Sequence, residues 1–254
     1  MGLCGTEQTP LLEEGSIEFF CSGKGCPEAL MVPPLPVMHF GVEAGFQLPQ
    51  NEVVETAIRK EAKLIPEIVM RELVANALIH QDFTISGTLM MVEIYAGRTE
   101  ISNPGEPVVP VERFIDGHES RNEGLVRVMR RLGICEEKSS GIDRVISEVE
   151  ACQLPAPDFH TGYCSTVVTI HGFKDFKEMD SRERIRACYQ HCALKWVTSQ
   201  RMTNSSLRER FGLYKNKSAV VSQIIATTVG ASLIKLDEQG SVSRRFARYI
   251  PFWA

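Results

Sequence analysis

Apolar positions recur on every face of a helix in the stretch 66–83. An α-helix turns by about 100° per residue, and at that angle the apolar side chains leave no broad solvated side. They are Ile68, Val69, Leu73, Val74, Ala75, Ala77, Leu78 and Ile79. Pro66 suits the first turn, where its missing N–H has no helical partner to lose. Because a helix that is apolar almost all round is normally covered by other elements, we predict a buried helix that packs on a sheet.

Three polar residues interrupt this helix along a single line. Glu72, Asn76 and His80 lie at positions i, i+4 and i+8, which form one narrow stripe. Burying a carboxylate and an amide without partners is unfavourable. The stripe is therefore predicted to face a cleft, a ligand or a metal. The residues alone leave a second reading open, in which these side chains pair with other groups of the core.

Strands and helices follow this helix in the order hairpin, helices, strand. Residues 89–95 alternate as a strand does, 96–98 form a hairpin turn, and 99–102 continue as a strand up to a turn signal at 103–105. The remaining predicted elements are helices at 111–115, 124–132 and 139–152 and a last strand at 164–171. This order indicates an α+β domain over residues 51–173, a two-layer α/β sandwich with helices on one face of a mixed sheet.

The segment 1–50 is interpreted as an irregular or truncated N-terminal segment. It holds seven glycines and six prolines with little periodicity, and the Pro-Pro-Leu-Pro run at 33–36 cannot form a helix. Short strands are predicted at 16–21 and 37–40. Residues 51–62 are expected to form a helix or a loop that leads into the buried helix.

Residues 180–254 predict a second domain. Asp180 followed by Glu183 resembles a capping box and opens a helix that runs to about residue 197. Thr203 caps a second helix, and Gly212 ends it. A third helix at 217–229 and a strand, turn and strand at 233–250 complete the layout of a winged helix-turn-helix domain.

The net charge of −4 conceals two regions of opposite charge. From Lys177 to the C-terminus the chain has 14 basic and 6 acidic side chains, a net +8, whereas residues 1–176 have 14 basic and 26 acidic side chains, a net −12. A basic hairpin is suited to contact DNA phosphates as the wing of such a domain, and a polar third helix is suited to lie in the major groove. The predicted DNA-binding residues are Lys215, Lys217, Ser218, Ser222, Gln223, Arg244, Arg245 and Arg248. As alternatives, the basic residues only solvate a small domain, or the wing binds protein.

Composition restricts the class of protein. The hydrophobic fraction of 43% and the charged fraction of 24% are those of a soluble globular protein. No apolar run approaches the roughly 18 residues of a membrane span, and the N-terminus lacks the layout of a signal peptide, so a cytoplasmic protein is expected. The eight cysteines form no C-x-x-C pair. Cys188, Cys192 and the adjacent His191 are too few for a metal site, and buried thiols are expected instead.

Four short motifs carry a resemblance that spans about residues 50–172. They are R-E-L-V-A-N-A-L-I-H-Q-D-F at 71–83, I-S-N-P-G at 101–105, S-R-N at 120–122 and L-G-I-C-E-E-K-S-S-G-I-D-R-V at 132–145. In this order they resemble the ATP-binding domain of the RecG-like C-terminal type, which belongs to the GHKL superfamily of ATPases and has its Bergerat fold. Relatives usually combine a Schlafen-type domain, this ATP-binding domain and a winged helix in transcriptional regulators.

The resemblance implies that ATP and Mg²⁺ bind along the polar stripe. By this resemblance Glu72 is the catalytic general base that activates water. Asn76 binds Mg²⁺ through its side-chain oxygen, and His80 lies within reach of a phosphate.

The other motifs imply further nucleotide-binding residues. Asn103 stands where relatives have an aspartate for the adenine amino group, and Gly105 allows the backbone to approach the base. Ser139, Ser140 and Gly141 form the loop that cradles phosphate at a helix N-terminus, with one glycine where relatives have two. Arg121, with Asn122 beside it, is placed at the same cleft.

These inferences predict a DNA-binding transcriptional regulator whose ATP-binding domain controls a winged helix through nucleotide-dependent closure or homodimerisation. One alternative is a slow Mg-dependent ATPase that acts as a defence-type effector. Another is a degenerate interaction module without nucleotide binding, which the reduced loop at 139–141 favours. A helicase is not supported, because the chain contains no G-x-x-x-x-G-K-[ST] loop.

Overall fold

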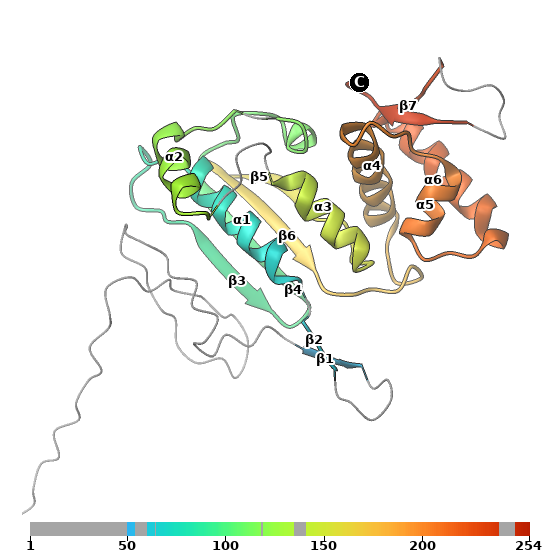
Figure 1. Cartoon of the computed structure of the whole chain (residues 1–254), viewed down its shortest axis with the longest axis horizontal. Coiled ribbons are helices and arrows are strands. Elements are labelled where there is room, and N and C mark those ends of the chain that lie inside the picture. The colour runs from blue at the N-terminus through green and yellow to red at the C-terminus, as the bar shows by residue number, and fades with distance from the viewer. Residues whose placement is uncertain (1–49, 54–59, 64, 118, 135–140, 239–246) are drawn as a thin grey trace, which may run out of the picture.

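The protein is described by a computed structural model that covers residues 50–53, 60–63, 65–117, 119–134, 141–238 and 247–254 (Figure 1). The strands predicted within the first 50 residues lie outside this part of the chain. Residues Gln50–Val53 (β1) and Lys60–Lys63 (β2) form a small antiparallel hairpin. A helix or loop was the expectation for this segment. In the part of it that the structure describes, the backbone groups of the two strands pair with each other instead.

A four-stranded sheet is the framework of the first domain. Its strands are Met91–Tyr95 (β3), Arg98–Pro104 (β4), Asp158–Gly162 (β5) and Ser165–His171 (β6). They are hydrogen-bonded in the order β3-β4-β6-β5, and every neighbouring pair is antiparallel. The prediction of a mixed sheet was therefore wrong. β5 was not predicted, because its short polar run follows Pro155 and Pro157 and is regular only through its pairing with β6.

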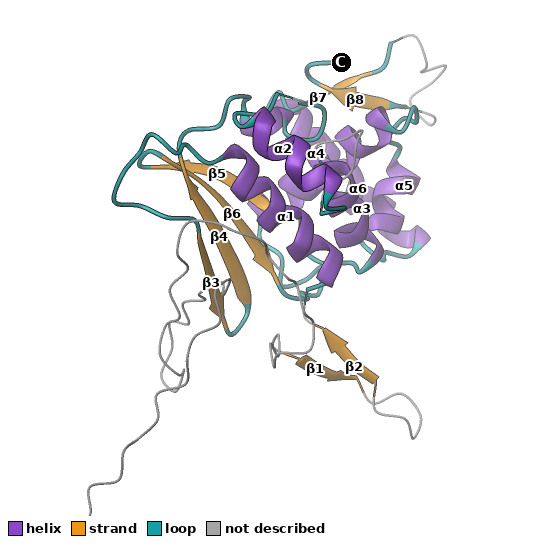
Figure 2. Cartoon of the chain, turned by 60° about the vertical axis from the view of Figure 1, so that its left-hand side comes forward, coloured by secondary structure: helices purple, strands orange, loops and turns teal. Residues whose placement is uncertain are grey.

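Helices cover one face of this sheet, as predicted (Figure 2). They are Glu67–His80 (α1), Glu123–Arg131 (α2) and Ile142–Ala151 (α3), with a 3₁₀ turn at Val111–Arg113 (η1) in place of the predicted helix. α1 is buried along most of its length, and its Val69 and Leu73 pack with Val145 of α3 and Ile170 of β6. Each such side chain stabilises the fold by roughly 1.5–3 kcal/mol. The prediction of an α+β arrangement with a buried first helix is confirmed.

The C-terminal unit consists of three helices and a hairpin. Its elements are Ser181–Val197 (α4), Asn204–Arg210 (α5), Lys215–Lys217 (η2), Ser218–Gly230 (α6), Ile234–Leu236 (β7) and Tyr249–Pro251 (β8). The predicted capping box of Asp180 and Glu183 is present, and Thr203 caps α5 as expected. Because these caps satisfy N–H groups that have no partner inside the helix, local sequence determines where both helices begin. In the described part of the chain, no helix combines the length and the apolar character that crossing a membrane requires.

The C-terminal unit packs tightly on the end of α3. A carboxylate oxygen of Glu150 on α3 lies within hydrogen-bond distance of Nδ1 of His191, at 2.9 Å, and the other lies 3.3 Å from Nε of Arg210. Nε2 of His191 is 3.0 Å from the hydroxyl of Ser206. We call Glu150, His191, Ser206 and Arg210 the Glu150 cluster. Since it joins acidic and basic regions of the chain, part of the charge asymmetry seen in the sequence is neutralised inside the molecule.

Candidate functional site

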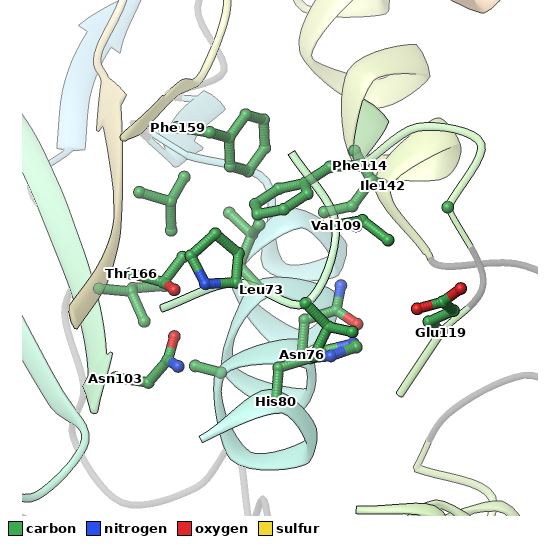
Figure 3. A pocket seen from close by; sticks show the side chains of 16 residues that line it. Leu73, Asn76, His80, Asn103, Val109, Phe114, Glu119, Ile142, Phe159 and Thr166 are labelled. Carbon is green, nitrogen blue, oxygen red and sulfur yellow. The ribbon is translucent and has the colours of Figure 1, made fainter. Parts of the chain in front are cut away.

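A pocket opens between α1 and the helix-covered face of the sheet (Figure 3). It encloses roughly 650 Å³ of empty space, its open mouth included. Its walls are largely apolar and include Leu73, Ile101, Phe114, Ile142, Phe159 and Val168. A few polar side chains converge on it, namely Asn76, His80, Asn103, Glu119 and Thr166. An apolar slot with few polar groups is the usual form of a small-molecule site.

Asn103 lies deep in this pocket, on β4. Its side chain is buried, and its amide donates one long hydrogen bond of 3.4 Å to the carbonyl of Pro104. Thr166 of β6 is its partner in the strand register, and the Thr166 hydroxyl donates to the carbonyl of Gly105 at 2.9 Å. The two residues therefore place an amide and a hydroxyl side by side on the pocket floor. Thr166 was missed from the sequence, although the pairing of the last strand with residues 101–105 would have identified it.

Asn76 lines the pocket from α1 and has an unsatisfied polar atom. Its Nδ2 is buried and has no hydrogen-bond partner within the described residues. The same atom is 3.6 Å from the place that a Cβ of Gly141 would take. A buried polar atom without a partner costs about 1–3 kcal/mol, which a ligand can recover. A half-turn of the amide would present its oxygen, so Asn76 fits either a hydrogen-bond acceptor or a hard cation such as Mg²⁺.

His80 stands one turn further along the same stripe and also lines the pocket. Burial lowers its pKa, and the nearby Arg121 guanidinium lowers it further. The imidazole is therefore neutral at pH 7 and offers a hydrogen bond rather than a positive charge.

Glu72, the third member of the stripe, is not among the residues that line the pocket. Its side chain is only 6% exposed, and its Oε1 lies 3.4 Å from Arg71 and 3.6 Å from Arg144 of α3. Its Oε2 lies against Gly141, which precedes α3 with a left-handed φ of 74°. A Cβ at position 141 would sit only 2.7 Å from that oxygen, so glycine is required there. The structure thus brings Glu72 and Asn76 together with Gly141, whereas Ser139 and Ser140 lie outside the described residues.

Gly105 and Arg121 support the pocket from outside and do not line it. Gly105 has a φ of 104°, and a Cβ there would be 2.7 Å from that of Asp82. Arg121 is tied to Asp82 by an ion pair of 2.5 Å and donates to the carbonyl of Glu106. Asn122 donates to the carbonyls of Ile79 and Gln81, each at 2.8 Å, and so caps the end of α1.

The predicted DNA-binding residues are distributed over the C-terminal unit. Lys215 and Lys217 are exposed on η2, and Ser222 and Gln223 are exposed on α6. Ser218 donates to the Asn204 oxygen, and the Asn204 amide donates to Ser222, so these serines also tie α6 to α5. Arg248 is exposed in front of β8, whereas Arg244 and Arg245 lie outside the described residues.

The thiols of Cys188 and Cys192 on α4 are buried, as the sequence predicted. Within the described part of the chain, no three His, Cys, Asp or Glu side chains gather in a way that could hold a metal ion. Burial raises the pKa of the Cys188 thiol to about 12 and raises the pKa of Cys192 as well. These cysteines are inert packing residues, as the sequence predicted.

Comparison with known proteins supports an ATPase-type domain. Residues 87–170 match the family model described as "Putative ATP-dependent DNA helicase recG C-terminal". The match includes the pocket residues on β4, β5 and β6 but begins after α1, so the polar stripe lies outside it. A search of curated proteins found no match. The DIP2311 protein from Corynebacterium diphtheriae is a solved structure with 18% identity and a TM-score of 0.48; the match covers 80% of this chain and 42% of that one.

Proposed function

We propose that this chain is an ATP-binding transcriptional regulator in which a GHKL-type nucleotide domain controls a C-terminal winged helix that binds DNA. The observation that carries the proposal is the pocket itself. Its walls are largely apolar, and the Asn103 amide is one of the few polar groups that line it. The Asn76 amide, whose Nδ2 has no partner among the described residues, also lines the pocket and lies near Gly141. Flat apolar walls suit a purine ring, and an amide beside a helix N-terminus suits phosphate with its cation.

Five residues that line the pocket, together with Glu72 beside it, have definite roles in this proposal. Asn103 accepts a hydrogen bond from the adenine amino group, while Phe114 and Phe159 exclude water from the ring. Asn76 holds Mg²⁺ through its oxygen, and His80 donates to a phosphate. When bound, Mg-ATP supplies a phosphoanhydride bond, and Glu72 is the residue proposed to activate water there. Because Glu72 now faces Arg144 and Gly141, hydrolysis requires its side chain to turn toward the pocket.

The C-terminal unit is proposed to bind DNA through α6 and the following hairpin. The outward face of α6 exposes Ser222 and Gln223 and carries no charged residue, which suits contact with base edges. Lys215 and Lys217, together with the predicted Arg244, Arg245 and Arg248, would contact phosphates on either side.

α3 is the proposed connection between the two activities. Its first turn lies at Gly141 beside the pocket, and its last turn carries Glu150 into the cluster with His191 and Arg210. A helix is stiff over this length, so a shift of its start on nucleotide binding would be passed to the C-terminal unit.

A titration of the purified chain with ATP and Mg²⁺, followed by calorimetry, tests the nucleotide site. We expect saturable binding that weakens at least about tenfold in Asn76→Ala, the loss of one cation ligand or charge-assisted bond. Asn122→Ala serves as a matched control, because it removes an amide of the scaffold outside the pocket. DNA affinity measured with and without nucleotide then tests the regulation. Equal DNA affinity in both states would contradict it.

A second candidate is an interaction module without nucleotide binding. One observation favours it, since among the residues that the structure describes, those that line the pocket include no lysine and no arginine. Absence of ATP binding up to several millimolar, combined with an intact fold, would select this candidate.

A further inference from the structure

An amide stands at the proposed base-binding position, and an amide can both donate and accept a hydrogen bond. Asn103 lines the pocket from β4, and its side chain is buried. Figure 3 shows it beside Thr166 on the floor of the pocket. Its Oδ1 only accepts, whereas its Nδ2 only donates. Which chemistry a ligand meets there depends on how the amide is turned.

The contacts of Asn103 leave this orientation open. Among the described residues its side chain makes one hydrogen bond, a long one of 3.4 Å from Nδ2 to the carbonyl of Pro104. That carbonyl also accepts a shorter bond of 2.7 Å from the backbone N–H of Asp82. A half-turn of the Asn103 amide would exchange its donor and its acceptor, and the Pro104 carbonyl would keep the stronger of its two partners. Little therefore opposes either orientation.

Thr166, the neighbour of Asn103 in the strand register, is more definite. Its hydroxyl donates to the carbonyl of Gly105 at 2.9 Å, so its proton is engaged and its oxygen can still accept. The pocket floor thus combines one acceptor with one amide that can turn either way. Adenine presents an exocyclic amino donor next to a ring nitrogen that accepts, whereas guanine presents an exocyclic oxygen next to a ring N–H donor. Either edge finds matching groups on this floor.

We propose that the site binds purine nucleotides with an exocyclic oxygen, such as GTP, as well as those with an exocyclic amino group, such as ATP. This inference rests on the proposed nucleotide function and names its substrate class. Toward adenine the Asn103 oxygen accepts from the amino group, and toward guanine its nitrogen donates to the exocyclic oxygen. A carboxylate could only accept, and guanine would place its oxygen against the negative charge. The variant Asn103→Asp should therefore select adenine.

A purely structural role for Asn103 predicts a different result. If its amide only supported the backbone at Pro104, replacing it would weaken every purine nucleotide by one common factor. The ratio of the ATP and GTP affinities is therefore the deciding quantity, because contributions from phosphate, Mg²⁺ and the apolar walls cancel in it. Asn103→Leu has a similar size but no polar side-chain atom, so it should weaken both nucleotides and leave their ratio near that of the wild type.

The experiment is a calorimetric titration of the full chain with ATP, GTP and inosine triphosphate in the presence of Mg²⁺, at about pH 8 to keep the introduced carboxyl ionised. Inosine triphosphate has the exocyclic oxygen of guanine without its amino group, so a clash of that amino group is not mistaken for recognition. The wild type is compared with Asn103→Asp and Asn103→Leu. Asn216→Asp is the control, because it adds the same charge at an exposed position on η2. Thermal unfolding verifies that each variant is folded.

We expect the wild type to bind ATP and at least one of the other two nucleotides within about tenfold of each other, and Asn103→Asp to prefer ATP by roughly 10- to 100-fold more than the wild type does. Asn216→Asp should keep the wild-type ratios. A larger wild-type preference for ATP over both others, or an unchanged ratio in Asn103→Asp, would overturn the proposal while leaving the nucleotide pocket standing. If the wild type binds none of the three, the proposed nucleotide function itself is wrong.

Discussion

Two glutamates that contact opposite ends of α3, Glu72 of α1 beside Gly141 and Glu150 in the last turn of α3, show how differently this fold uses the same side chain. Glu150 makes a short contact of 2.9 Å with His191, which also reaches Ser206, and Arg210 closes the cluster. Among the described residues, Glu72 lies 3.4 Å from Arg71 and 3.6 Å from Arg144, and near the Asn76 amide, whose Nδ2 has no partner there. Nε of Arg210 in the Glu150 cluster also lacks a hydrogen-bond partner among those residues, but it lies against Glu150 and another nitrogen of Arg210 donates to the carbonyl of Leu154. The two ends therefore differ in that Asn76 lines a pocket, where a ligand can satisfy its amide.

The contrast also explains why α3 is central to the molecule. The end with Glu150 contacts the C-terminal unit, and the end that begins after Gly141 lies at the pocket, which Ile142 lines. Variants of the two ends should therefore separate stability from binding.

Removing Glu150 should cause the greatest loss of stability. Glu150→Ala leaves His191 and Arg210 buried without their carboxylate, and breaking a buried pair in this way costs roughly 3–5 kcal/mol. Urea unfolding measures the free energy of unfolding directly. Glu148→Ala, on the same helix and outside the cluster, is the control and should cost below about 0.5 kcal/mol. Similar losses in both variants would show that the cluster contributes little.

A methyl group at position 141 should disturb the end of α3 that lies at the pocket. Gly141→Ala combines a left-handed backbone with a clash against Glu72, and we expect a loss of about 2–3 kcal/mol in unfolding free energy together with weaker ATP binding. Gly133 has a similar φ of 69° but nothing within 4 Å of its Cβ position. Gly133→Ala should therefore cost only the backbone strain of about 1 kcal/mol. If both variants lose the same stability, the contact of Gly141 with Glu72 is unimportant.

Asn76 should behave as a ligand residue and not as a structural one. Asn76→Ala removes an unsatisfied amide from a helix, so stability should stay level or rise by up to about 1 kcal/mol. Asn122→Ala removes two hydrogen bonds of 2.8 Å that cap α1 and should cost about 1–2 kcal/mol. Thermal unfolding of the two variants gives the comparison. A clear loss in Asn76→Ala would mean that its amide has a partner in the folded protein.

The smallest effect concerns pH. The pKa of His80 is lowered from its ordinary value of 6.5, chiefly by burial and also by Arg121. The unfolded chain then binds the proton more readily than the folded one, so this contribution to stability is present above pH 6.5 and is lost as the pH falls below it. Unfolding at about pH 7.5 and about pH 5 should show that His80→Gln loses less stability on acidification than the wild type. An equal loss of stability on acidification in His80→Gln and the wild type would contradict this role of His80.

Much of the local structure followed from short-range patterns. The buried helix with its stripe, the hairpin at 89–102, the caps at Asp180 and Thr203 and the order of the C-terminal elements were all predictable. β5 and the antiparallel sheet were not, because an edge strand of polar residues becomes regular only through its neighbour. Of the site residues predicted from the sequence, some line the pocket and others lie outside it. Asn76, His80 and Asn103 reach the pocket, whereas Gly105 and Arg121 build its support.

Local sequence was enough to identify α1, the caps at the start of α4 and α5 and the polar side chains that share one face of α1, because these features depend on neighbours a few positions apart. The contacts of Glu72 with Arg144, of Thr166 with Asn103 and of Glu150 with the C-terminal unit depend on how distant segments pack together. Such pairs are distant in the chain, and their partners are selected by strand register and by how α3 packs on α1 and α4. The residue types determine which hydrogen-bonding and charged groups the chain has. The packing determines which of these groups find a partner in the folded protein and which remain available to a ligand.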